Sequence, residues 1–174
     1  MKSVAEFNDI YDEKRVKTGR VHKRGTTWKK GDYGLTVCVW VYDGRGRLLL
    51  TRRAREKSYP GTWENSGGAV KAGEDSLHGI QRELYEETGI FAELQEFELI
   101  DQGKDNYMHY DFYCVKKDTP LSKIKLLPGE TDGVRWADFR QVHTLVESGE
   151  ICDIIGKQFI KQEPLLLMRN ISKV

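Results

Sequence analysis

Three acidic residues close together in the sequence allow the first chemical inference. Glu83, Glu86 and Glu87 are spaced at i, i+3 and i+4, so on a helix they would share one face. Like charges at this spacing repel by about 0.2–0.5 kcal/mol per pair in an isolated helix, so such acids are either left in water or joined by a cation. Mg²⁺ prefers oxygen ligands and keeps water molecules that substrate phosphates can replace. The spacing therefore predicts a metal-assisted reaction at phosphate, with Mg²⁺ as the ion and Mn²⁺ as an alternative.

These acids belong to a longer pattern that covers residues 68–90. The pattern G-x5-E-x7-R-E-U-x-E-E-x-G-U, with U an aliphatic residue, is filled by Gly68, Glu74, Arg82, Glu83, Leu84, Glu86, Glu87, Gly89 and Ile90. It resembles the signature of the Nudix hydrolases, and the surrounding strand order over residues 34–150 also resembles that family. The resemblance implies an α+β fold (mixed α/β), namely an α/β/α sandwich with a mixed sheet and a loop–helix–loop catalytic motif.

The resemblance also implies roles for the motif residues. The ligands of one or more Mg²⁺ ions would be Gly68, through its carbonyl group, and Glu83, Glu86 and Glu87. The metal would neutralise a diphosphate, orient it and acidify a water molecule for attack on phosphorus. Arg82 and Glu74 would form a charge-assisted pair that fixes the loop against the helix. The ordinary alternative for this pair is an exposed salt bridge worth less than about 1 kcal/mol.

The sequence does not determine which residue acts as the general base. Glu83, within the motif, is one candidate, and Glu130, in a loop ahead of a short strand, is the other. The ordinary interpretation of Glu130 is a solvated loop acid. Asp111, in a strand-like segment, is a weaker candidate.

The sequence before the motif indicates a branch of the family. Residues 33–70 resemble the same region of isopentenyl diphosphate isomerases and their hydrolase-like relatives. Arg53 and Lys57 match basic residues that contact the diphosphate in that branch, although Arg53 could equally be a surface residue. The isomerase reaction needs a cysteine where this chain has Gly68, and a histidine ligand where it has Gly34. We therefore expect a hydrolase that cleaves a pyrophosphate linkage in a nucleoside diphosphate linked to another moiety, or in a related diphosphate.

Two alternatives remain: an isopentenyl-diphosphate isomerase-like protein, and a non-catalytic nucleotide- or RNA-binding module of the same fold. The second is motivated by residues 14–30, which hold eight Lys or Arg and no acid, so they could attract phosphate. The ordinary interpretation of this segment is a solvated hairpin. The complete set of acids favours catalysis, because a binding module gains nothing from mutually repelling carboxylates. We expect a small-molecule diphosphate as partner rather than nucleic acid or membrane; a homodimer is common among relatives.

The elements that must position the motif are mixed strands and helices. Residues 75–88 are predicted to form the motif helix, whose apolar stripe lies about a quarter turn from the glutamates, so one side can pack while the other faces a cleft. Further helices are predicted through 142–147 and from about 151, the last disturbed at Pro164. Strands are predicted at 7–12, 35–42, 47–54, 92–100, 108–115 and 133–139, with a hairpin turn at 43–46 and a loop at 103–106.

Composition sets the outer bounds. The 174 residues are 39% hydrophobic and 32% charged, with a net charge of +1, which is typical of a soluble globular protein. We expect a single domain that covers residues 1–174. Its core would lie at about 34–150, preceded by an N-terminal basic strand or hairpin segment and followed by a C-terminal helix. No stretch approaches the length of a membrane span, and the first fifteen residues contain no apolar leader segment. Three cysteines without CxxC spacing fit a reduced, cytoplasmic setting.

Overall fold

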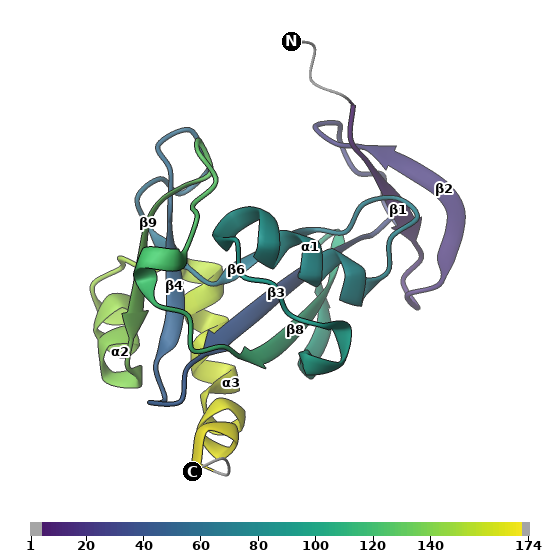
Figure 1. Ribbon diagram of the computed structural model, residues 1–174. Helices are drawn as coiled ribbons and strands as arrows, with labels where there is room; N and C mark the ends of the chain where they lie inside the picture. The colour runs from purple at the N-terminus through teal and green to yellow at the C-terminus, as the bar shows by residue number, and fades with distance from the viewer. Residues whose placement is uncertain (1–4, 172–174) are drawn as a thin grey trace.

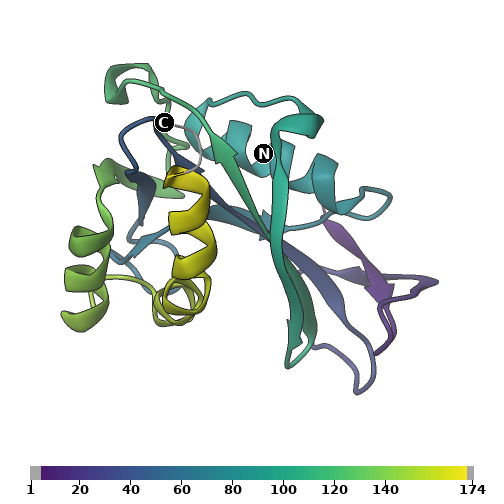
Figure 2. The ribbon, with the colours of Figure 1, turned by 90° about the horizontal axis from the view of Figure 1, so that it is seen from below.

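The computed structural model describes residues 5–171 (Figures 1 and 2). Its strands are β1 (Phe7–Tyr11), β2 (Lys17–Lys23), β3 (Gly34–Tyr42), β4 (Leu48–Arg53), β5 (Trp63–Glu64), β6 (Ser66–Ala69), β7 (Glu98–Asp105), β8 (Met108–Lys116) and β9 (Thr131–Ala137). Its helices are α1 (Ser76–Thr88), α2 (Phe139–Glu147) and α3 (Asp153–Ile171), with short 3₁₀ turns η1 (Leu94–Glu96) and η2 (Leu121–Lys123). Within the described part, no helix is long and apolar enough to cross a membrane.

The large sheet is mixed, and it divides into two branches. β3 runs parallel to β8 and antiparallel to β4 and β6. β3 and β4 share a single register pair, Tyr42 with Leu48, beside the turn that joins them, so the predicted hairpin is paired only there. Over residues 36–39 of β3, β6 takes the place of β4 as the neighbouring strand. The branch β9–β4–β5 therefore diverges from the branch β6–β3–β8–β7, as Figure 1 shows.

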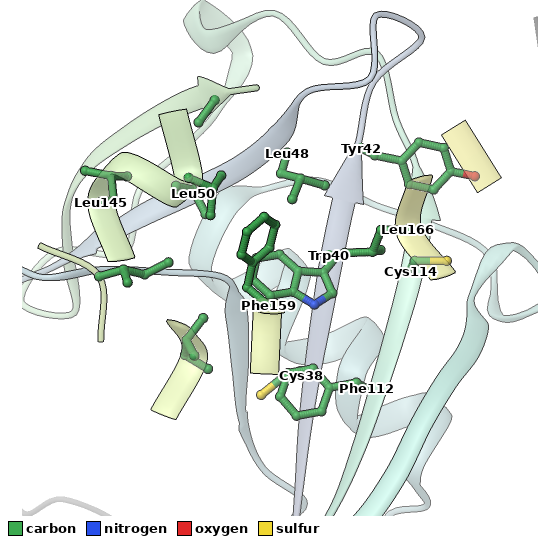
Figure 3. Close-up of a cluster of buried hydrophobic side chains, with 14 of the residues drawn as sticks. Cys38, Trp40, Tyr42, Leu48, Leu50, Phe112, Cys114, Leu145, Phe159 and Leu166 are labelled. Atoms are coloured by element: carbon green, nitrogen blue, oxygen red, sulfur yellow. The ribbon is translucent and has the colours of Figure 1, made fainter. Parts of the chain in front are cut away.

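Helices cover both faces of this sheet. On one face, Ile80 and Leu84 of α1 pack in a cluster with Val37 and Val39 of β3. On the other face, Trp40 packs against Phe159 of α3 (Figure 3). The alternation along β3 is the two-residue repeat of a strand buried on both sides. The predicted α/β/α sandwich with a mixed sheet is confirmed.

Local signals fix the two ends of α1. Asp75 caps the first turn, because its side chain accepts a hydrogen bond of 2.8 Å from the backbone N–H of His78. Gly89 ends the helix in the left-handed conformation with φ of 70°, and its N–H donates to the Tyr85 carbonyl. The predicted helix at 75–88 is confirmed to within one residue. With Ile80 and Leu84 buried in the core, the neighbouring glutamate face is turned toward β6.

An N-terminal ribbon, which we define as residues 6–24, forms a separate two-stranded sheet and folds back on the motif loop. Asn8 Nδ2 donates to the Val70 carbonyl at 2.8 Å, and Ala72 N–H donates to the Phe7 carbonyl at 2.8 Å. The expected strand at 7–12 and the basic hairpin segment are both present. The ribbon therefore lies beside the motif instead of extending freely from the chain.

Several boundaries differ from the sequence prediction. The strand expected at 133–139 ends at Ala137, and Phe139 begins α2, whose start was expected at 142. The strand expected at 92–100 begins only at Glu98, because residues 94–96 form η1 with a capping box from Glu93 and Glu96. A loop was predicted at 103–106. This prediction is wrong for residues 103–105, which belong to β7, because that strand continues to Asp105. Gly103 is needed for close approach, because a Cβ there would lie 2.3 Å from Tyr110 Oη. The helix was also expected to be disturbed at Pro164, but α3 continues through this residue.

Candidate active site

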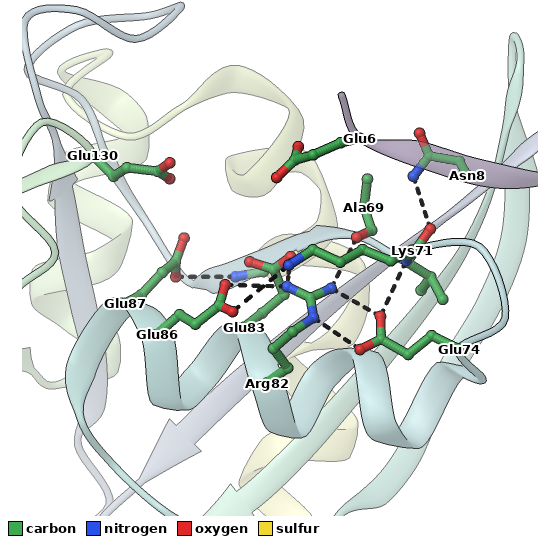
Figure 4. A network of polar contacts seen from close by, with 12 residues as sticks. Glu6, Asn8, Ala69, Lys71, Glu74, Arg82, Glu83, Glu86, Glu87 and Glu130 are labelled. Carbon is green, nitrogen blue, oxygen red and sulfur yellow. Dashed lines mark hydrogen bonds and ion pairs between the residues drawn. The ribbon is translucent and has the colours of Figure 1, made fainter. Parts of the chain in front are cut away.

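The acids of α1 lie against β6, whose two glycines leave room for them (Figure 4). A Cβ on Gly68 would lie 2.5 Å from Glu83 Oε1. A Cβ on Gly67 would lie 2.3 Å from the Val37 carbonyl oxygen of β3. Only glycine therefore permits this approach of the helix, the strand and the Glu83 carboxylate.

Arg82 joins the motif loop to the motif helix. Its Nε and Nη2 donate to the two oxygens of Glu74 at 2.8 and 2.9 Å, a bidentate pair. Its Nη1 donates to Glu83 at 2.7 Å and to Glu86 at 3.2 Å, and Nη2 also reaches the Ala69 carbonyl at 3.2 Å. The side chains of Arg82 and Glu74 are each 18% exposed. The structure thus brings the predicted pair together in a partly buried network, which is more than an isolated surface salt bridge.

Burial makes the carboxyl groups beneath this network costly to ionise. Glu87 is 7% exposed, and burial, with the added charges of Glu64 and Glu83, raises its pKa from 4.5 to about 8. Its carboxylate accepts an N–H from Gly67 at 3.3 Å. Burial also raises the pKa of Glu83 and of Glu64, against the opposing effects of Arg82 and Arg53. These three carboxyl groups are therefore costly to ionise chiefly because they are buried.

We expect the metal-free Glu87→Gln variant to be more stable than the wild type at high pH. The folded-state pKa of Glu87, about 8, exceeds the ordinary value of 4.5, so the stability from its neutral form is complete below pH 4.5 and is lost as pH rises through 8. Glutamine stays neutral, so the difference should grow from near zero at pH 5 to roughly a few kcal/mol at pH 9. Urea unfolding in chelator at both pH values measures it. Glu147→Gln, on the exposed side of α2, is the control, and an equal difference at both pH values would contradict the prediction.

A pocket of about 90 Å³ lies beside Glu83 and Glu86, and we call it the acidic pocket; Glu87 is not among its lining residues. It is lined by Glu6, Asn8 and Arg24 of the ribbon, Gly67, Gly68, Ala69, Lys71, Arg82, Glu83 and Glu86 of the motif region, Lys57 of the β4–β5 loop, and Leu127 and Glu130 of the loop before β9. Figure 4 shows the carboxylates of Glu6 and Glu130 directed toward the space above the motif acids.

The structure brings Lys57 and Glu130 together at this pocket. Lys57 Nζ donates to Glu130 Oε2 at 2.8 Å. Glu130 is thus ion-paired across the pocket from the motif, although its side chain is 41% exposed. Glu83 and Glu130 both line the pocket, so both remain candidates for the general base.

Two other candidate residues lie elsewhere. Arg53 donates from Nη1 to Glu64 at 2.6 Å and from Nη2 to Ser58 Oγ at 2.9 Å, beside a second pocket of about 370 Å³ between β3, β8 and α3. Arg53 and Lys57, which were both candidates for contact with substrate phosphate, therefore lie in different pockets. Asp111 is buried near the start of α1, where it accepts from Arg15 at 2.5 Å and from Gln102 at 2.9 Å. Asp111 holds the ribbon in place and does not line the acidic pocket.

Three charged residues of the pocket were not singled out from the sequence: Glu6, Arg24 and Lys71. Lys71 Nζ lies 3.7 Å from Glu86 Oε1, and Arg24 is ion-paired with Glu6. The only sequence signal for Arg24 was the run of basic residues at 14–30, which gave no information about where the ribbon docks.

The donor groups fit a hard divalent cation. Among residues 5–171 no three acidic, histidine or cysteine side chains already converge on one point, and Arg82 instead holds Glu83 and Glu86. Glu87 makes no ion pair with any described residue, however, and is a buried carboxyl group close to other acids. Carboxylate oxygens such as those of Glu83, Glu86 and Glu87 are the ligands that Mg²⁺ or Mn²⁺ accepts.

Comparisons with known proteins agree on one family. A model of the NUDIX domain matches residues 32–151. An uncharacterized Nudix hydrolase of Listeria monocytogenes is 30% identical over 149 residues, which are 82% of this chain and 85% of the relative. An isopentenyl-diphosphate Delta-isomerase of Serratia proteamaculans is 39% identical over 128 residues, 71% of this chain and 68% of the isomerase.

A solved structure shares the fold. The crystal structure of DR0079 from Deinococcus radiodurans superposes with a TM-score of 0.74 over 90% of this chain and 99% of that one. Its sequence identity is 19%, so the likeness concerns the fold alone.

Proposed function

The chain belongs to the Nudix hydrolase family, whose members generally hydrolyse pyrophosphate bonds, and on this premise we propose that it is a Mg²⁺-dependent hydrolase of a small-molecule diphosphate. The substrate class would be a nucleoside diphosphate linked to another moiety, or a related diphosphate. The observation that carries the proposal is the acidic pocket, which is lined by Gly68, Arg82, Glu83 and Glu86 of the motif together with Lys57 and Glu130 from other loops.

The motif residues, with Lys57 and Glu130, have separate roles in this proposal. The Gly68 carbonyl group, Glu83, Glu86 and Glu87 would hold the ion. When bound, such an ion neutralises a diphosphate, orients it and lowers the pKa of a water molecule. Arg82 and Glu74 fix the loop against the helix, so that the carboxylates keep their places. Either Glu83 or Glu130 accepts the proton of the attacking water, while Lys57 offsets the negative charge of the substrate.

A panel of pyrophosphate compounds tests the proposal. Purified protein would be incubated with nucleoside triphosphates, dinucleotides, nucleotide sugars and isopentenyl diphosphate, with Mg²⁺, with Mn²⁺ or with chelator. We expect hydrolysis of at least one compound only when a divalent ion is present. Turnover in chelator would contradict the proposal, as would proton exchange into isopentenyl diphosphate without hydrolysis. Submicromolar RNA binding that falls steeply with salt, without hydrolysis, would favour a binding module instead.

Metal binding can be measured without turnover. At 100 times its dissociation constant, Mg²⁺ should stabilise the folded protein by about 2.7 kcal/mol, which for a chain of this size raises Tm by roughly 5–10 °C. We expect most of this rise to be lost in Glu87→Gln, because the variant lacks one charged ligand. Differential scanning calorimetry with Mg²⁺ and with chelator provides the comparison. An equal rise in wild type and variant would exclude Glu87 as a ligand.

A further inference from the structure

The N-terminal ribbon is held near its turn and along β1. The end opposite the turn, which carries Glu6 and Arg24 and which we call the open end, therefore has a defined position. Near the turn, Arg15 is ion-paired with the buried Asp111 at 2.5 Å. Along β1, Asn8 is bonded to the Val70 carbonyl, and the Gly73 N–H donates to Asp9 at 3.0 Å. The residues at the open end, Glu6 and Arg24, are consequently held at the rim of the acidic pocket.

Arg24 and Glu6 form an ion pair over the motif acids. The Arg24 N–H donates to the Glu6 carbonyl at 2.9 Å, and the Arg24 guanidinium is ion-paired with the Glu6 carboxylate. The hydrogen bond with Glu6 raises the pKa of Arg24 above its ordinary value, and the charges of Glu130 and Glu83 add to this effect. The guanidinium therefore lies within electrostatic reach of both the motif and the loop before β9.

The Arg24 guanidinium is suited to exchange the Glu6 carboxylate for a phosphate group. The Arg24 side chain is 61% exposed and that of Glu6 42%, and exposed pairs of this kind contribute little to stability. A phosphate group carries more charge than a carboxylate and accepts two parallel hydrogen bonds from a guanidinium. Lys57 has the same arrangement on the opposite side of the pocket, where Glu130 is its partner.

We propose that Arg24 binds a phosphate group of the diphosphate substrate at the rim of the acidic pocket, and that Glu6 holds Arg24 there until the substrate replaces it. The inference rests on the proposed function and assigns a substrate contact to the N-terminal ribbon. It also gives the basic segment 14–30 a specific part in catalysis, through one residue rather than through its total charge.

Steady-state kinetics of three variants test the contact. Arg24→Gln should raise KM by about 10–100-fold, the range of a hydrogen bond to a charged group, and change kcat by less than about 3-fold. Glu6→Gln should lower KM by roughly 2–5-fold, because the competing carboxylate is removed. Arg20→Gln is the matched control, since Arg20 lies in the same ribbon, is 56% exposed and pairs with Asp32 away from the pocket. Its KM should match the wild type.

Binding of inorganic pyrophosphate with Mg²⁺, measured by calorimetry, separates this inference from the proposed function. Wild-type turnover with an unchanged KM in Arg24→Gln would overturn the inference and leave the function standing. A rise in KM in Glu6→Gln equal to that in Arg24→Gln would also overturn it, because the pair would then be structural. If the wild type hydrolysed no compound, the proposed function would fail, and pyrophosphate affinity would decide: a loss of about 10-fold or more in Arg24→Gln supports the contact, and an unchanged affinity refutes it.

Discussion

Replacement of Glu86 by glutamine is expected to lower kcat by about 100-fold or more while the fold is retained. Glutamine keeps the size of the side chain but removes the negative charge that would hold the metal. The Glu86 side chain is 42% exposed and contacts Arg82 at 3.2 Å and Lys71 at 3.7 Å. Loss of such exposed contacts changes stability by less than about 1 kcal/mol, so a fall in activity would not come from unfolding.

The measurement is kcat at saturating substrate over a Mg²⁺ titration, with circular dichroism and Tm on the same samples. Glu147→Gln, an exposed acid on α2, should retain full activity and shows the effect of removing one surface charge. If excess Mg²⁺ restores part of the activity of Glu86→Gln, the residue acts through metal affinity. Full activity of Glu86→Gln at all Mg²⁺ concentrations would be incompatible with its role as a ligand.

The sequence predicted best the parts of the fold that local chemistry decides. α1 is bounded by the side chain of Asp75 and the left-handed Gly89, both of which act within one turn of the helix. The division of the sheet was not predicted, because pairing of Gly68 with Val37 depends on residues far apart in the chain. The same is true of Gly103, which resembles a turn residue in the sequence but faces Tyr110 in a strand.

In the candidate site as well, the sequence predicted what local spacing decides and did not predict what long-range docking decides. Glu83, Glu86 and Glu87 share α1, so their spacing alone places them within one turn of each other. Lys57 and Glu130 were expected from the family resemblance, and the structure places both at the pocket. Arg24 and Glu6 could not be located in advance, since no periodic pattern indicates where a two-stranded ribbon docks.

Substitution by alanine should have different effects at the two adjacent glycines of β6: a loss of activity at Gly68 and a loss of stability at Gly67. In Gly68→Ala, the new Cβ would lie 2.5 Å from Glu83 Oε1 and 2.6 Å from Oε2, the free end of a side chain that can rotate away. The fold should therefore survive, but Glu83 would leave its place beside the other acids. We expect kcat to fall by about 100-fold or more, with an unfolding free energy within roughly 1 kcal/mol of the wild type.

In Gly67→Ala, the Cβ would lie 2.3 Å from the Val37 carbonyl oxygen and 2.9 Å from Cys38 Cα, both of which belong to the buried backbone of β3. The central strand cannot move aside without disturbing both hydrophobic clusters, so overpacking should cost about 1–3 kcal/mol or more of stability. Urea unfolding and kcat of both variants distinguish the two mechanisms. Equal losses of stability would show that Gly68 is required for strand packing. Full activity of a folded Gly68→Ala protein would show that the position of the Glu83 carboxylate is not needed for catalysis.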